Sequence, residues 1–132
     1  MDTSTGNPTS EELAGYLKKF PNLKIVILDG NKFLDSIPSD MFIGMKKLKV
    51  VSMIDSNINV LPKGLFSMNP QLKCLILKDS AVQSIRKNVF RANVANKLKE
   101  VDLRGSQMTK QSGLKGLFKG KRNVAKFLSR LP

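Results

Sequence analysis

The chain has 132 residues but no histidine, no tryptophan and a single cysteine, Cys74. Without histidine it lacks both the commonest general base and the commonest metal ligand of proteins. One thiol with no histidine also leaves no zinc site of the usual kind, and no glycine-rich phosphate loop of the usual pattern is present. We therefore expect no catalytic residue, no metal and no cofactor, and a protein that is not an enzyme.

Disulfides, long apolar runs and a leader-like start are also lacking. A single cysteine excludes an internal disulfide, unlike the small secreted scaffolds. No run approaches the ~20 apolar residues of a membrane span. The first residues, MDTSTGNPTSEEL, are polar and acidic, the opposite of a signal peptide. These features predict an intracellular protein, cytoplasmic or nuclear.

Acidic residues are scarce, with 10 Asp and Glu against 23 Lys and Arg, which gives a net charge of +13. Such a balance favours polyanionic partners. Residues 103–132 hold eight basic residues and no acidic one, so the charge is concentrated at the C-terminal end. Nucleic acid or an acidic membrane surface is the alternative partner that this segment predicts, with six candidate residues: Lys115, Lys119, Lys121, Arg122, Lys126 and Arg130.

What the chain does contain is a repeat of about 24 residues. Phe42, Phe66 and Phe90 are each 24 residues apart. Four segments that begin with Leu-Lys carry apolar residues at their first, fourth and sixth positions. They start at Leu23, Leu48, Leu72 and Leu98, and their ninth residues are Asn31, Ser56, Ser80 and Ser106. One short strand cannot bury its apolar side alone, so we expect the strands to stack side by side.

This pattern resembles the leucine-rich repeat family, whose consensus is L-x-x-L-x-L-x-x-N, over about Leu23 to Lys110. The phenylalanine column and the pairs Ile37-Pro38 and Leu61-Pro62 resemble the typical 24-residue subclass. The resemblance implies an α/β solenoid, right-handed, with a short parallel β-sheet on a concave face and irregular convex loops. It also implies a non-catalytic module for protein–protein interaction, and leaves open a repeat region related to those of immune receptors.

A solenoid exposes apolar surface at both ends, so helical caps are expected there. Residues 9–20 predict the N-terminal cap, because Thr9 and Glu12 have the spacing of a capping box and Pro21 ends the helix. The basic residues 111–132 predict a C-terminal cap, or else the anion-binding segment described above. The whole chain, 1–132, is interpreted as one domain with repeats at 23–47, 48–71, 72–97 and 98–110.

The third, fifth, seventh and eighth residues of each Leu-Lys segment, counted from its leucine, are expected on the concave face. Each of the first three strands contributes two apolar residues at these positions, and carboxylates lie around them. This combination predicts a partner protein or peptide with apolar anchors and basic flanks, and no small-molecule substrate. The candidate contact residues are Ile25, Ile27, Asp29, Val50, Ser52, Ile54, Asp55, Cys74, Ile76, Lys78, Asp79, Glu100, Asp102 and Arg104.

Overall fold

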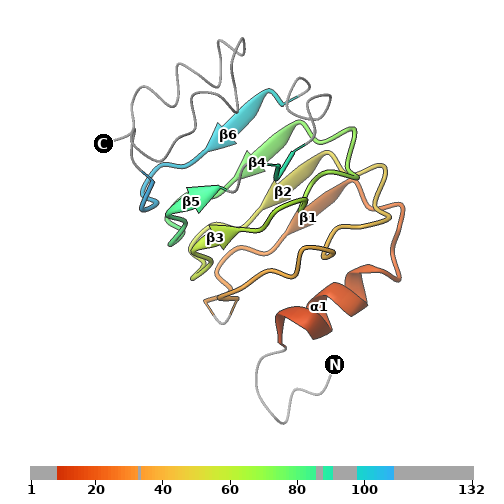
Figure 1. Ribbon diagram of the computed structural model, residues 1–132, viewed down its shortest axis with the longest axis horizontal. Coiled ribbons are helices and arrows are strands. Elements are labelled where there is room, and N and C mark those ends of the chain that lie inside the picture. The colour runs from red at the N-terminus through yellow and green to blue at the C-terminus, as the bar shows by residue number, and fades with distance from the viewer. Residues whose placement is uncertain (1–8, 33, 86–87, 91–97, 109–132) are drawn as a thin grey trace.

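A computed structural model describes residues 9–32, 34–85, 88–90 and 98–108 (Figure 1). One helix precedes a series of short strands. In chain order the elements are α1 (Ser10–Leu17), β1 (Ile25–Ile27), β2 (Val50–Ser52), β3 (Val60–Leu61), β4 (Cys74–Ile76), β5 (Ser84–Ile85) and β6 (Glu100–Asp102). The strands of the main sheet start at the third residue of each Leu-Lys segment, because the repeat returns the chain to the same position every 24 to 26 residues.

The main sheet has the order β1-β2-β4-β6, and all its pairs are parallel. Its register follows the repeat, with Val26, Val51, Leu75 and Val101 side by side. These four residues are almost fully buried, so every strand directs its central side chain to the same apolar layer. The predicted parallel sheet is therefore confirmed for the described residues.

A second, two-stranded parallel sheet pairs β3 with β5 through Val60↔Ser84 and Leu61↔Ile85. Figure 1 shows β3 and β5 lying across one face of the main sheet. The apolar core fills the space between the two layers. The other face of the main sheet carries the first and last residue of each three-residue strand, which are the third and fifth residues of the Leu-Lys segments. We call it the open face.

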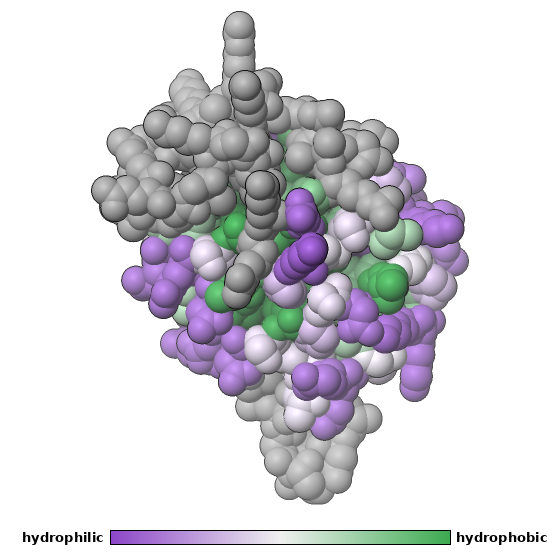
Figure 2. Space-filling view, viewed as in Figure 1, coloured by the Kyte–Doolittle hydropathy of each residue, from purple (hydrophilic) through white to green (hydrophobic). Residues whose placement is uncertain are grey.

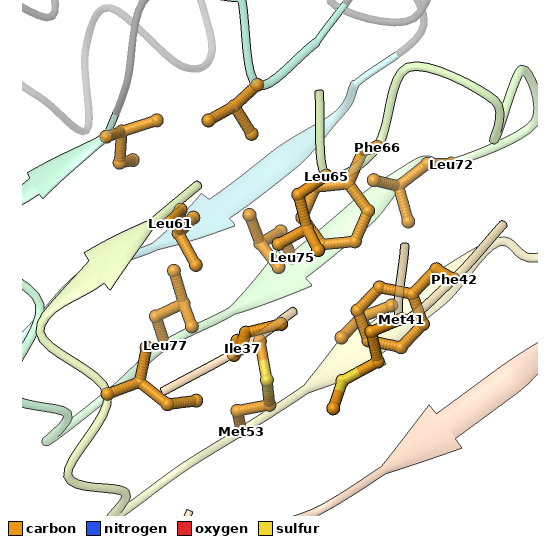
Figure 3. Close-up of a cluster of buried hydrophobic side chains, with 14 of the residues drawn as sticks. Ile37, Met41, Phe42, Met53, Leu61, Leu65, Phe66, Leu72, Leu75 and Leu77 are labelled. Carbon is orange, nitrogen blue, oxygen red and sulfur yellow. The ribbon is translucent and has the colours of Figure 1, made fainter. Parts of the chain in front are cut away.

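Stacked phenylalanines run through this core. Phe42 and Phe66 have ring centroids 5.3 Å apart, and Phe66 and Phe90 have centroids 5.6 Å apart, with ring planes 14° and 13° from parallel. Figure 3 shows Phe66 near Leu72 and Leu75, and Phe42 near Met41, among the buried side chains of this core. The three phenylalanines are buried, so this column points inward behind the sheet, and each ring links one repeat to the next.

Helix α1 is shorter than the range 9–20 predicted for it. Thr9 is its N-cap, and the Thr9 Oγ1 accepts a hydrogen bond from the backbone N–H of Glu12 at 3.1 Å. Ala14 and Leu17 join the core, while the Lys18 Nζ forms an exposed ion pair with Asp40 at 2.9 Å. The cap predicted for residues 111–132 lies outside the described residues.

The first repeat is less buried than the others. Leu23 and Leu28 are only partly buried, whereas their counterparts Leu48 and Met53 are 0% exposed. The difference arises because α1, rather than another repeat, lies on the outer side of β1 in the described part of the chain. This exposure fits the expectation that a solenoid leaves apolar surface at its end.

Candidate binding face

Apolar side chains on the open face are most exposed on β1 and less exposed on and near β2 and β4. Ile25 is 56% exposed and Ile27 is 64% exposed. Val50 on β2 and Cys74 and Ile76 on β4 are half-buried, and so is Ile54, which follows β2. Together these residues form an apolar strip across three neighbouring strands, which a folded protein seldom leaves open to water without a use.

Two predicted contact residues are buried. Ser52 is 4% exposed, and its hydroxyl donates to the Asp29 Oδ1 at 2.6 Å. Asp102 is 6% exposed and holds Arg104 through Nε and Nη2, with the shortest contact at 2.8 Å. The expectation that both side chains are open to a partner is therefore wrong. Their polar groups are occupied by neighbours, and they position Asp29 and Arg104 instead.

The hydrogen bond from Arg104 is the main reason why the pKa of Asp102 is lowered below its usual range. Burial acts in the opposite direction but is the smaller effect. Asp102 therefore stays ionised at neutral pH, and Arg104, which remains exposed, is fixed by a two-point contact. This pair makes the β6 end of the open face polar.

Carboxylates border the open face where the strands end. Asp29 lies after β1, and its Oδ1 accepts from the backbone N–H of Ile54 at 2.9 Å as well as from Ser52. Asp55 and Asp79 follow β2 and β4 as the eighth residues of their repeats, one position later than Asp29 in the first repeat, and both have positive φ, 56° and 55°, a conformation that aspartate tolerates better than most residues. All three carboxylates are exposed. They form an acidic border beside the apolar strip.

Cys74 is half-buried in the apolar strip, with its Sγ 3.5 Å from the Glu100 Oε2. Burial, and then the nearby Glu100 carboxylate, raise the pKa of the Cys74 thiol to about 11. The thiol is therefore protonated at neutral pH, which is the opposite of an activated nucleophile. This supports the interpretation of Cys74 as a small apolar contact residue.

Sequence reasoning missed two features. Asn69 is 0% exposed, and its side-chain Nδ2 donates to the carbonyl oxygens of Phe42 at 2.9 Å and Met45 at 3.1 Å, which ties two repeats together. The other is a set of exposed apolar residues outside the strands of the sheet: Tyr16, Phe20, Ile43 and Met68. Figure 2 shows the molecule from the side of β3 and β5, where hydrophobic surface occurs as separate spots among hydrophilic residues.

A family model described as leucine-rich repeat matches residues 21–79. Residues 21–79 are leucine-rich repeats. The structure extends the same arrangement beyond the matched segment, since β6 pairs with β4 in the register that β4 has with β2. Leucine-rich repeat domains generally mediate protein–protein interaction and are typically not enzymes. No curated protein matched the chain.

The described part of the chain contains no group of three His, Cys, Asp or Glu side chains arranged to hold a metal ion. No helix among the described residues is long and apolar enough to cross a membrane. The six basic residues of the alternative anion site, from Lys115 to Arg130, lie outside the described residues.

Proposed function

We propose that this leucine-rich repeat protein is a non-catalytic interaction module that binds a protein or peptide on its open face. The supporting observation is the apolar strip that crosses β1, β2 and β4, with three exposed carboxylates along its border. The partner would place apolar side chains on the strip and Lys or Arg residues beside the carboxylates.

The apolar strip supplies the affinity in this proposal. Complete burial of an exposed isoleucine is worth about 1.5–3 kcal/mol. Ile25 and Ile27 are each more than half exposed, so their burial by a partner would contribute about 1–2 kcal/mol apiece. The less exposed Val50, Ile54 and Ile76 would add smaller amounts. These five residues would form the energetic centre of the contact.

The acidic border supplies orientation and selects against nucleic acid. Asp29, Asp55 and Asp79 would face the phosphates of a nucleic acid bound on this side, and like charges repel. Basic residues of a protein partner would instead gain from the same carboxylates, mainly in the rate of association. The open face is therefore proposed to prefer a partner with basic flanks.

The double variant Ile27→Glu with Ile54→Glu tests this function. It adds two charges to the apolar strip but touches no core side chain, so the circular dichroism spectrum should stay unchanged while capture of a protein partner from native cell extract is lost. The matched control is Ile43→Glu with Met68→Glu, which alters two exposed apolar residues outside the sheet strands.

The two variants should be compared at low and high salt. Capture that resists salt, is lost in the open-face variant and is kept in the control supports the proposal. Unimpaired capture by the open-face variant contradicts it. If that retained binding is to nucleic acid and weakens steeply with salt, the basic C-terminal segment is the better explanation.

A further inference from the structure

The outer edge of β1 is the edge that faces away from β2. It carries backbone N–H and C=O groups that form no hydrogen bond with the rest of the described chain. Val50 donates its N–H to the Lys24 carbonyl at 3.1 Å, and Leu28 donates to Ser52 at 2.8 Å, so the even-numbered residues of this segment face β2. Successive strand residues direct their N–H and C=O groups to opposite sides. Ile25 and Ile27 therefore direct theirs away from β2, where no hydrogen-bond partner is found among the described residues.

The side chains at this edge reinforce what the backbone offers. Ile25 and Ile27 are 56% and 64% exposed on the open face, while Val26 between them is 4% exposed and holds the strand to the core. An unprotected strand edge with apolar side chains is a template for pairing with another extended chain. The sequence Ile-Val-Ile contains no proline and no charge that would discourage such pairing.

Helix α1 limits what can lie beyond the outer edge of β1. Figure 1 shows α1 beside β1 on the side away from β2, and its residues Ala14 and Leu17 are buried in the core. A second copy paired through its own β1 would bring its own α1 beside its β1, into the region that α1 occupies. One added strand needs only the usual spacing of about 4.8 Å.

We propose that β1 accepts one extended peptide segment of a partner as an additional strand of the sheet. The inference rests on the proposed function, because Ile25 and Ile27 belong to the open face. The segment would carry apolar residues at alternate positions, next to Ile25 and Ile27. It would carry Lys or Arg beside the exposed Asp29, whose Oδ1 is held by Ser52 and Ile54. Backbone hydrogen bonds would give affinity, and the alternate side chains would give selectivity.

The probe is a synthetic peptide of ten residues in all. It has two lysines at each end, and valine and threonine alternate between them. With saturating peptide, hydrogen exchange of the Ile25 and Ile27 amides should slow about tenfold or more, since each gains a hydrogen bond. The amides of Val51 and Leu75, in the middle of the sheet, should not change. The matched control peptide has the same sequence with its valine nitrogens methylated, which removes strand donors and keeps the side chains.

A protein variant tests the same contact from the other side. Ile27→Pro removes one outward N–H at an edge position, where proline is tolerated, and should weaken peptide binding about tenfold. The matched control Ile27→Val keeps the N–H and should bind within about threefold of the wild type. If Ile27→Pro fails to fold, the methylated peptide decides the matter, because it leaves the protein unchanged.

Equal binding of the two peptides, or unchanged exchange at Ile25 and Ile27, would overturn the proposal. Slower exchange at these amides on concentrating the protein alone would also overturn it, by showing that a second copy occupies the edge. The natural partner could bind the Ile27→Pro variant normally but fail to bind the Ile54→Glu variant. That result would leave the proposed function standing and reject strand addition.

Discussion

Asn69 is expected to be one of the most sensitive positions outside the apolar core. Its side chain is fully buried between two repeats, and its Nδ2 donates to the carbonyl oxygens of Phe42 and Met45. Each of those carbonyls also accepts a backbone N–H, from Met45 and Leu48 respectively. Replacement of Asn69 by alanine would therefore remove two hydrogen bonds without leaving either carbonyl unpaired.

The magnitude follows from this geometry. A buried hydrogen bond contributes about 1 kcal/mol net, so Asn69→Ala should lower the free energy of unfolding by about 2 kcal/mol. The small cavity adds to the loss, while removal of the Oδ1, which is buried with no hydrogen-bond partner among the described residues, offsets part of it. Asn69→Asp keeps the shape but turns acceptors towards carbonyl oxygens, and an unpaired buried charge costs about 3–5 kcal/mol. The aspartate variant should therefore be the less stable of the two.

Urea unfolding followed by circular dichroism would measure both variants. The matched control is Asn57→Ala, because the exposed Asn57 also donates across repeats, to the Lys32 carbonyl, and its loss should cost less than about 1 kcal/mol. Burial would raise the pKa of the introduced carboxyl, so the penalty of Asn69→Asp should shrink as the pH falls towards 3. A loss below about 0.5 kcal/mol for Asn69→Ala, or Asn69→Asp as stable as Asn69→Ala at neutral pH, would refute this reasoning.

Two further predictions concern the open face and its border. Gly30→Ala should cost about 1 kcal/mol in unfolding free energy from the positive φ alone, since no atom of the described residues lies within 4 Å of its added Cβ. Gly105→Ala should cost somewhat more, because its Cβ would lie 2.0 Å from the Asp79 Oδ1 and the exposed Asp79 side chain would have to move away. Measured against Asp79→Ala instead of the wild type, Gly105→Ala should lose only the smaller amount, and equal losses for the two single variants would count against the contact. The raised pKa of Cys74 predicts alkylation by iodoacetamide at pH 8 that is roughly 10- to 100-fold slower than in the urea-unfolded chain. Glu100→Gln should recover only part of that rate, because burial is the larger cause, and equal rates in the folded and unfolded chain would show that the thiol is not perturbed.

Much of the fold is predictable here because one pattern is repeated four times. The apolar residues at the first, fourth and sixth positions place the strands, and the 24-residue step of the phenylalanines places the stacked rings behind them. Parallel pairing then follows, since each strand must lie beside its equivalent in the next repeat. A single copy of the pattern, such as Leu72 to Ser80, would be compatible with several folds.

The features that escaped prediction depend on contacts between particular repeats. Asn69 has Met45 as its counterpart 24 residues earlier, so the repeat pattern does not mark it; an asparagine three residues after Phe66 is the only local signal. Ser52 and Asp102 are the equivalents of Ile27, which is exposed in β1. Ser52 is buried by its contact with Asp29 in the neighbouring repeat, and Asp102 by its contact with Arg104 two residues ahead. Such side-chain choices require the three-dimensional arrangement.

The most direct test of the central claim is to ask which face touches the partner. A photoactivatable cross-linking residue would be placed at Ile54 on the open face and, in a matched protein, at Met68, which is similarly apolar but outside the sheet strands. Both proteins would be irradiated in native extract at high salt. We predict a discrete cross-linked protein from position 54 and none from position 68. Cross-linking from position 68 alone, or equal yields from both positions, would contradict the assignment of binding to the open face.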